Sequence, residues 1–377
     1  MANLPIYLDH AAATPLDPAV LNAMQSYFSD NFYNPSANYG AAQSVRQALD
    51  TARTEAAYWL GAKPSEIIFT AGGSEANNLA IHGVMRQFPE ANIVISGVEH
   101  ESVLEPAQEY DVRQIAVGLD GRIDLTDLTS KIDGNTVFVS IMYANNEIGS
   151  IQPIRQAAQI IKQKRSQRKV GDKPLYFHSD AAQAANYLDL HVSRLGVDMM
   201  TLNGGKIYGP KQSGLLYIKA GIKLLPLVQG GGQERGLRSG TENVAASIGL
   251  ARALKLVQSD RQAESERLSG LQAQFFDLLE KVIKDIVING SRKFRLPNNV
   301  HVTLPGRDNE RLLFQLDEQN IMAAAGSACN ASNETPSHVL RALGLSDETA
   351  RSSLRFTMGR STTIDMVKQV VKTLAKL

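Results

Sequence analysis

The sequence predicts an α/β protein in which a large domain with a mostly parallel sheet is joined to a smaller α+β domain. Short apolar segments typical of strands are separated by stretches with helical periodicity, the pattern of a parallel sheet with helices on both faces. Glycine-rich or polar motifs follow directly after several of these segments. From about Arg295 onward the regular alternation stops, which indicates a second structural unit.

The length and charge of the chain limit the classes of protein to which it can belong. The chain has 377 residues and is 43% hydrophobic, enough for two domains with substantial cores. Its 39 basic and 38 acidic residues create no overall field that would attract nucleic acid or an anionic membrane. No apolar run approaches the roughly 18 to 20 residues that cross a bilayer, and the N-terminus lacks signal-peptide features. We therefore expect a cytoplasmic protein with no membrane partner and no direct nucleic-acid partner.

The N-terminal part predicts a short strand and two helices. The strand covers 4–8 and leads into a turn-rich loop. A helix follows Asp17, because Asp is a good N-cap and Pro18 suits the first helical position. Apolar residues at helical spacing predict a second helix over 44–60, which ends at Gly61.

A possible anion site follows the next strand. The apolar segment 66–70 runs into Gly72, Gly73 and Ser74, where a new helix begins. Unpaired backbone N–H groups and the helix dipole at such a turn favour an anion. A helix cap without a ligand explains this stretch equally well. The absence of a GxGxxG motif disfavours a dinucleotide-binding dehydrogenase.

Four further strands carry the alternation onward, and they are predicted at 92–96, 136–142, 174–178 and 214–218. In sheets of this class, ligands bind outside the carboxyl ends of the strands. Polar motifs lie just after predicted strands at 70–74, 99–100, 145–147 and 180–183. Their shared position predicts one common pocket at this edge of the sheet.

A lysine within the stretch 201–210 is the centre of the functional prediction. Lys206 follows an apolar run and two glycines and precedes Tyr208, Gly209 and Pro210. Taken alone, it is better explained as a lysine in a surface turn. The upstream aromatic and β-branched run that ends at Asp180 changes this interpretation, because a lysine and an aspartate are the two groups that bind pyridoxal phosphate (PLP), one covalently and one at the pyridinium nitrogen.

The C-terminal part predicts a different arrangement. A long helix over roughly 242–283 precedes strands and helices at 298–304, 309–318, 321–325, 353–360 and 364–377. We place the large PLP-binding domain at 15–257 and the smaller domain at 1–14 and 258–377.

Cys329 is the single cysteine, so an intramolecular disulfide and a metal site built from several thiolates are excluded, and no metal site is predicted. A lone cysteine is more often a small buried hydrophobe. Here the surrounding stretch 325–336 is a loop of small residues without packing aromatics. Burial therefore explains this cysteine poorly, and we interpret it as a reactive thiol that reaches a substrate.

These motifs together resemble those of the cysteine desulfurases, PLP enzymes of the class V aminotransferase superfamily, and in particular the NifS/IscS-like group with a long catalytic-cysteine loop. The matching segments are 34–36, 70–77, 99–100, 145–149, 180–183, 206–211, 235–241, 326–329 and 355–360. The resemblance covers essentially the whole chain. It implies PLP fold type I, which is aspartate aminotransferase-like.

The resemblance also implies a role for each matching residue. Catalysis would depend on Lys206 as the lysine that bonds PLP and moves protons, on His100 over the ring, and on Cys329 as the sulfur acceptor. The implied cofactor-binding residues are Gly73, Ser74, His100, Asn146, Asp180, Gln183, Asn203, Gly205, Lys206 and Thr241, the last from the partner subunit of a homodimer. The implied substrate-binding residues are Asn34, Asn146 and Arg355, whose planar guanidinium matches a carboxylate.

One motif departs from the family pattern. Relatives usually carry Ser-x-His before the PLP lysine, and this chain has Asn203, Gly204 and Gly205. Asn203 can still offer an amide N–H and Gly205 a backbone N–H, but one side-chain donor to the phosphate is lost. We expect PLP to be held more weakly than in relatives with the histidine.

The function implied is conversion of L-cysteine to L-alanine, with the sulfur left as a persulfide on Cys329. A protein acceptor, either a scaffold or a sulfur carrier, would then take this sulfur for iron–sulfur cluster assembly or tRNA thiolation. Two alternatives remain open: a selenocysteine lyase, and a non-catalytic scaffold with the PLP fold.

Overall fold

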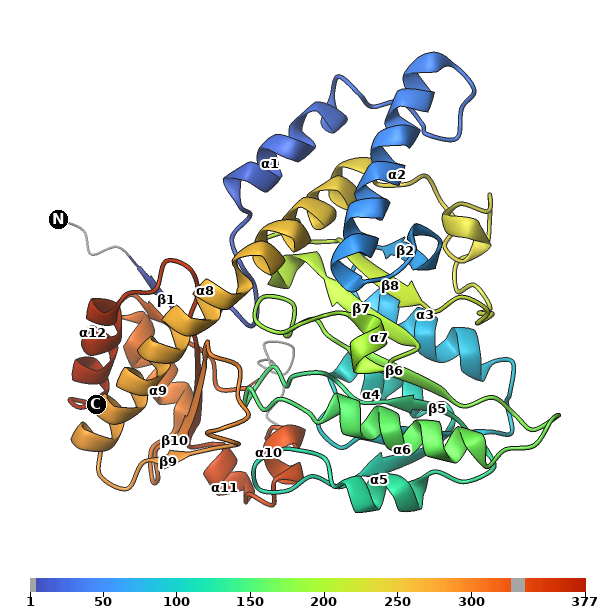
Figure 1. Ribbon diagram of the computed structural model, residues 1–377. Helices are drawn as coiled ribbons and strands as arrows, with labels where there is room; N and C mark the ends of the chain where they lie inside the picture. The colour runs from blue at the N-terminus through green and yellow to red at the C-terminus, as the bar shows by residue number, and fades with distance from the viewer. Residues whose placement is uncertain (1–4, 327–335) are drawn as a thin grey trace.

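The computed structural model describes residues 5–326 and 336–377, and a large sheet dominates it (Figure 1). In spatial order its strands are β2 (Ile67–Thr70), β8 (Gly214–Ile218), β7 (Met199–Asn203), β6 (Tyr176–Asp180), β5 (Thr136–Ser140), β3 (Asn92–Ser96) and β4 (Asp111–Ile115). Neighbours from β7 to β4 are parallel, and β8 is antiparallel to both β7 and β2. The predicted mostly parallel sheet is confirmed.

Helices cover both faces of this sheet, as the sequence pattern predicts. They are α3 (Gly73–Met85), α4 (Glu101–Ala107), α5 (Leu125–Lys131), α6 (Ile154–Ser166) and α7 (Val192–Leu195). Ile93 and Phe138 belong to the apolar cluster that includes α3 and α4. Their neighbours Val94 and Val139 belong to the other cluster, which includes α6. Because side chains alternate along a strand, β3 and β5 are buried on both sides.

The C-terminal part forms two small sheets. In one, β10 (Asn299–Thr303) lies antiparallel between β9 (Val287–Ile288) and β12 (Ser353–Thr357); in the other, β1 (Ile6–Tyr7) pairs in parallel with β11 (Ile321–Met322). The accompanying helices are α9 (Asn309–Asp317), α10 (His338–Ala342), α11 (Asp347–Ala350) and α12 (Ile364–Leu374). The N-terminal strand therefore returns to the last part of the chain (Figure 1).

One long helix connects the two regions. Helix α8 (Val244–Val282) has 39 residues and begins at Asn243, whose side chain accepts the N–H of Ala246. It packs against α1 (Pro18–Gln25) and α2 (Gly40–Leu60) near its start and against α12 and β10 farther along (Figure 1). The boundary that we predict after residue 257 falls inside α8, and this domain division stays a prediction.

Individual elements differ from the sequence prediction in instructive ways. Asp17 caps α1 as expected, and its Oδ1 accepts the N–H of Ala19 at 2.8 Å. Helix α2 begins at Gly40, four residues before the predicted start at 44. The sequence analysis does not predict strand β4, because this strand lies at the edge of the sheet and is polar and largely exposed. The predicted strand at 321–325 is limited to β11.

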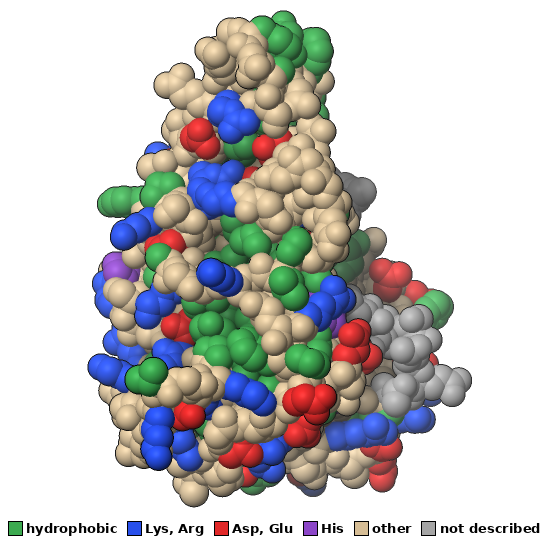
Figure 2. All heavy atoms as spheres, turned by 90° about the vertical axis from the view of Figure 1, so that its right-hand side faces the viewer, with side chains coloured by type: hydrophobic (Ala, Val, Ile, Leu, Met, Phe, Trp, Pro, Cys, Tyr) green, Lys and Arg blue, Asp and Glu red, His purple; other side chains and the backbone are tan. Residues whose placement is uncertain are grey.

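The outer surface carries charges of both signs. Figure 2 shows Lys and Arg side chains interspersed with Asp and Glu over one face, in keeping with the balanced composition. Across residues 5–326 and 336–377, the helices are either too short or too polar to span a bilayer.

Candidate active site

A cavity at the carboxyl ends of the parallel strands brings together most of the predicted site residues. Those that line it are Gly73, Ser74, His100, Asn146, Asp180, Gln183, Asn203, Lys206 and Arg355. They come from the last residues of β6 and β7, from the segments that follow β2, β3, β5, β6 and β7, and from β12. The sheet edge explains the convergence, because parallel strands present their carboxyl ends on one side.

Lys206 lies one short turn beyond β7 and points at the N-terminal segment. It ends the 3₁₀ helix η3 (Gly204–Lys206). Its Nζ donates to the carbonyl oxygens of Ala11 at 2.9 Å and Ala12 at 2.5 Å. The Gln183 amide also donates to Ala11 O, at 3.0 Å. The amine is therefore oriented at the wall of the cavity by two backbone carbonyls.

Asp180 is a buried carboxyl with hydrogen bonds to both oxygens. It is the last residue of β6 and is 6% exposed. Asn77 Nδ2 donates to Oδ2 at 2.7 Å, and the N–H of Ala182 donates to Oδ1 at 2.9 Å. Both oxygens of this carboxyl group thus accept N–H donors at the edge of the cavity.

The His100 ring is held by the start of α4. His100 is the N-cap of this helix, and its Nδ1 accepts the backbone N–H of Ser102 at 3.1 Å. The Ser102 hydroxyl lies 2.9 Å from the same nitrogen. With Nδ1 anchored in this way, the other ring nitrogen, Nε2, lies 3.8 Å from Glu101 Oε2.

Arg355 is a buried guanidinium with spare donor capacity. Its side chain is 1% exposed, and Nη2 pairs with Asp9 Oδ1 at 2.6 Å. Nη1 donates to Asn146 O at 3.1 Å, whereas Nε has no hydrogen-bond partner among the described residues. An unpaired N–H of a buried cation beside a cavity suits an incoming carboxylate.

The beginning of α3 forms the predicted anion cradle. Within the part of the chain that the structure describes, no side chain caps this helix at Gly72. A β-carbon on Gly73 would lie 3.3 Å from the Asn203 side chain, so glycine lets the two segments approach closely. The N–H of Gly205, which we expected to be offered to a phosphate, donates to Asn203 Oδ1 at 3.0 Å instead.

Three buried titratable groups are close in sequence to residues that line the cavity: Glu99 adjoins His100, Glu147 adjoins Asn146, and His178 lies two residues before Asp180. Burial raises the pKa of Glu99 to about 8 and lowers that of His178 to about 4. His178 is neutral at pH 7 and contacts the hydroxyls of Ser140 and Thr201 at 2.9 and 3.0 Å. Burial also raises the pKa of Glu147, which accepts a hydrogen bond from Ser337 Oγ at 2.5 Å.

Four predicted site residues are not among those that line this cavity: Gly205, whose N–H bonds to Asn203, and Asn34, Thr241 and Cys329. Asn34 is exposed in a turn, where its Oδ1 accepts the N–H of Ser36 at 2.9 Å. Thr241 lines a different hollow together with Arg238 and Glu242. Cys329 lies outside the described residues. The roles assigned to these residues stay predictions.

The structure also adds residues that the sequence reasoning did not single out. Asp9 pairs with Arg355, and Asn77 and Ser102 connect Asp180 with His100. Asn77 lies three residues after Ser74 in α3, and positions three apart share a helix face. That spacing was the one local signal that pointed to Asn77.

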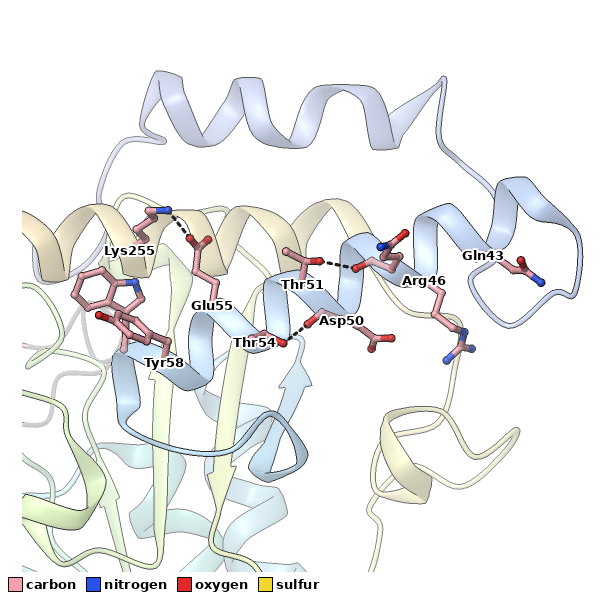
Figure 3. A pocket seen from close by; sticks show the side chains of 10 residues that line it. Gln43, Arg46, Asp50, Thr51, Thr54, Glu55, Tyr58 and Lys255 are labelled. Carbon is pink, nitrogen blue, oxygen red and sulfur yellow. Dashed lines mark hydrogen bonds and ion pairs between the residues drawn. The ribbon is translucent and has the colours of Figure 1, made fainter.

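A second hollow lies along α2 and contains none of the predicted site residues. Figure 3 shows Arg46, Asp50, Thr54, Glu55 and Lys255 beside it. Its polar groups largely bond to one another, as in the 2.7 Å pair between Lys255 and Glu55. This hollow offers no group suited to the chemistry above.

Comparison with known proteins gives a consistent family assignment. The family described as "Aminotransferase class-V" matches residues 6–370. The "Cysteine desulfurase IscS" of Dictyoglomus turgidum is 39% identical, with coverage of 98% of this chain and 95% of that protein.

Solved structures agree with the sequence relatives. A structure titled "NIFS-LIKE PROTEIN" superimposes with a TM-score of 0.91 and 29% identity, covering 99% of both chains. A structure titled "SspA in complex with cysteine" has a TM-score of 0.81 and 35% identity, covering 94% of this chain and 98% of that one.

Proposed function

The chain belongs to the aminotransferase class-V family, and we propose that it is a PLP-dependent cysteine desulfurase that converts L-cysteine to L-alanine. The observation that carries this proposal is the meeting of Lys206, Asp180 and Arg355 at one cavity. These side chains supply an amine for PLP, a carboxylate for its ring nitrogen and a cation for an amino-acid carboxylate.

The residues around the cavity fit PLP. Lys206 would bond it covalently, Asp180 would hold the hydrogen on the pyridine nitrogen, and the start of α3 at Gly73 and Ser74 would receive the phosphate. Gln183 and Asn146 would contact the ring oxygen or the substrate, and Asn203 would contact the phosphate. When bound, PLP withdraws electrons from an attached amino acid, which weakens the bond between its β-carbon and sulfur.

Substrate recognition would depend on Arg355. Its unpaired Nε and its neighbour Asn146 lie where an amino-acid carboxylate can be received. His100 would protect one side of the ring and move protons, and Asn34 would assist at the carboxylate. The related structure titled with bound cysteine supports this substrate class.

Cys329 would receive the sulfur. Its thiolate attacks the sulfur of the substrate, the carbon–sulfur bond breaks, and its electron pair stays with the carbon skeleton that becomes alanine. Gly326, the last residue described before this segment, lies near Glu147: a β-carbon there would be 3.5 Å from Glu147 Oε2. Ser337, on the far side, bonds to the same oxygen. Gly326 and Ser337, which precede and follow the segment that contains Cys329, are thus both close to Glu147, the residue after Asn146.

Assembly and partners extend the proposal. The protein would act as a homodimer in which Thr241 of one chain completes the phosphate site of the other. A protein acceptor would take the persulfide sulfur for iron–sulfur cluster assembly or tRNA thiolation. The cytoplasmic location that we expect from the sequence stays a prediction.

Incubation with L-cysteine tests the function directly. We expect alanine and sulfide in the presence of a reductant, and one added sulfur atom on Cys329 when the reductant is omitted. Cys329→Ala should abolish desulfuration of cysteine, and Lys206→Ala should remove the visible absorbance of bound PLP. Selenocysteine turnover that survives in Cys329→Ala, without turnover of cysteine by the wild type, would favour a selenocysteine lyase. Failure of the wild type to bind PLP would favour a scaffold.

A further inference from the structure

A chain of hydrogen bonds joins Asp180 to His100 through two residues that have no role in the proposed function. Asn77 Nδ2 lies 2.7 Å from Asp180 Oδ2 and 2.8 Å from Ser102 Oγ. Ser102 Oγ lies 2.9 Å from His100 Nδ1. All four residues are at or next to the cavity, and Asn77 is fully buried.

The direction of each hydrogen bond can be assigned from chemistry. A carboxylate only accepts, so the part of the Asn77 amide that faces Asp180 must be its NH₂ group. The reversed amide would place Oδ1 against the carboxylate oxygen. The two amide hydrogens are therefore used by Asp180 and by the Ser102 oxygen.

The His100 end of the chain has only one consistent tautomer. The backbone N–H of Ser102 can only donate, and it points at His100 Nδ1 from 3.1 Å. Nδ1 must then be the unprotonated nitrogen, so the neutral ring carries its hydrogen on Nε2. Ser102 Oγ, which accepts from Asn77, directs its own hydrogen at the same Nδ1, so the backbone N–H and the hydroxyl share the single lone pair of this nitrogen.

Asn77 has a buried oxygen without a hydrogen-bond partner in the part of the chain that the structure describes, which costs stability, so the two hydrogen bonds that its NH₂ group donates are the reason to look for a role. Its Oδ1 is buried and has no partner among the described residues. An apolar side chain of similar size would avoid that unpaired oxygen. The compensation that the structure shows is the pair of hydrogen bonds made by Nδ2.

We propose that Asn77 is a positioning residue: it orients the Ser102 hydroxyl toward His100 Nδ1, which supports the ring with its hydrogen on Nε2, and it also holds the Asp180 carboxylate. The inference rests on the proposed function, in which both residues act on PLP. One amide thus contacts the Asp180 carboxyl directly and His100 through the Ser102 hydroxyl. His100 can give a proton from Nε2, and its Nδ1 is not available as a base.

The tautomer can be observed without any turnover. In protein labelled with ¹⁵N-histidine, the protonated and unprotonated ring nitrogens resonate in separate regions, and His100→Gln identifies the signals of His100. We expect Nε2 protonated and Nδ1 unprotonated, in the protein with and without PLP. The opposite tautomer would overturn the proposal. Because no substrate is used, this result is independent of whether the protein is a desulfurase.

A matched pair of variants tests the coupling. Asn77→Asp places a second carboxylate against Asp180, and two carboxylates this close cannot both be ionised. Asn78→Asp makes the same change one residue later; Asn78 Nδ2 donates to the backbone oxygens of Ser74 at 2.9 Å and Ser102 at 3.4 Å, but not to Asp180 or to the Ser102 hydroxyl. We expect Asn77→Asp to change the absorbance spectrum of bound PLP and to lower kcat about 100-fold with KM within about threefold, and Asn78→Asp to do neither.

Equal spectra and equal kcat values for the two variants would refute the proposal. If Asn77→Asp does not fold, Asn77→Leu replaces it, since leucine keeps the volume and removes both donors. Asn77→Leu should shift the absorbance spectrum of bound PLP in the same direction as a variant without the Asp180 charge, such as Asp180→Asn. A wild-type spectrum in Asn77→Leu would equally refute it.

Discussion

Position 205 illustrates how one residue departs from the family and what space the fold leaves for its replacement. Gly205 has a backbone conformation that other residues adopt, since its φ lies outside the left-handed region. A β-carbon there would meet Asn203 Oδ1 at 3.4 Å and Lys211 at 3.7 Å, ordinary contact distances. The fold therefore leaves room at position 205 for the β-carbon of the histidine that relatives carry.

Restoring the family motif should tighten PLP binding. In Asn203→Ser/Gly205→His, the serine can still cap Gly205 and the imidazole adds a donor to the phosphate. We expect the Kd for PLP to fall about tenfold, equivalent to roughly 1.4 kcal/mol, as measured by equilibrium dialysis. Gly205→Ala, which adds only the β-carbon, serves as the control. An unchanged Kd in the double variant would contradict our explanation of the motif.

Asp9 should matter for stability because it is the counter-ion of a buried cation. In Asp9→Ala, Arg355 would keep only its bond to Asn146 O, and an uncompensated buried charge is costly. We expect the free energy of unfolding in urea to fall by roughly 3 kcal/mol.

The comparison for Asp9 is an ion pair in solvent. Asp347 pairs with Arg341 at 2.7 Å on the exposed surface, where such pairs contribute little. Asp347→Ala should leave the urea midpoint unchanged. Similar losses of unfolding free energy in Asp9→Ala and Asp347→Ala would show that the buried pair with Arg355 stabilises the protein no more than an exposed pair does.

Glu99 should give the stability of the protein a distinctive pH dependence. Burial raises its folded-state pKa from the ordinary 4.5 to about 8. Between these values the folded state binds more protons than the unfolded state, so the contribution of this group to stability falls as pH rises. Glu99→Gln cannot ionise and should escape that loss. The difference in unfolding free energy between variant and wild type should therefore move in favour of the variant from pH 5 to pH 8.

The check on Glu99 is a series of urea denaturation curves at several pH values. Glu90→Gln, at an exposed position, provides the same chemical change without burial. Parallel pH profiles for Glu99→Gln and the wild type would show that Glu99 does not carry this dependence.

At the scale of elements, α8 connects the large sheet with the C-terminal sheets. Its N-terminal half packs on α1 and α2, and its later turns pack on β10 and α12. Phe275 is fully buried, and its ring centroid lies 5.5 Å from that of Phe356 in β12. Because β12 also carries Arg355, this contact supports the strand that delivers the substrate-binding cation.

Phe275→Ala should destabilise the protein by roughly 3 to 5 kcal/mol, the usual cost of removing a buried aromatic ring. The measurement is the free energy of unfolding in urea. Gln274→Ala, at the adjacent exposed position of the same helix, should change it by less than about 0.5 kcal/mol. Two similar values would show that α8 is not held through this contact.

The loop at 9–14 contacts several residues of the candidate active site. Asp9 binds Arg355, Ala11 and Ala12 accept hydrogen bonds from Lys206, and the Thr14 hydroxyl accepts the N–H of Tyr208 at 2.7 Å. A single N-terminal segment thus contacts both the amine and the guanidinium on which the proposed reaction depends.

At the scale of the whole molecule, the proposed site depends on where Thr241 lies. Thr241 lines a hollow separate from the one that contains Lys206. Our proposal assigns the phosphate contact of Thr241 to another copy of the chain. The dimer is then part of the cofactor site in our proposal.

Hybrid dimers test this arrangement. In a mixture of Lys206→Ala and Thr241→Ala chains, each hybrid contains one site with an intact Lys206 and an intact Thr241 if the threonine acts across the interface. Borohydride reduction should then fix one tightly bound PLP per hybrid dimer, whereas dimers of Thr241→Ala alone bind PLP weakly. If Thr241 acts within its own chain, hybrids will show no tight site.

The sequence by itself determined the fold class and the edge of the sheet where the site lies. Both follow from local patterns: apolar strands, helical spacing, and polar motifs placed just after strands such as β6 and β7. Lys206, Asp180 and His100 could be selected because their residue types carry chemistry in positions where ligands bind.

Only the tertiary structure decided which polar atoms meet. Asp9 pairs with Arg355 across 346 positions of sequence, and Asn77 meets Asp180 across 103. Such contacts depend on how the sheets and helices pack around buried charges, since each buried donor or acceptor must find a partner wherever the fold provides one. No spacing along the chain could have shown that one asparagine connects the carboxylate with the histidine.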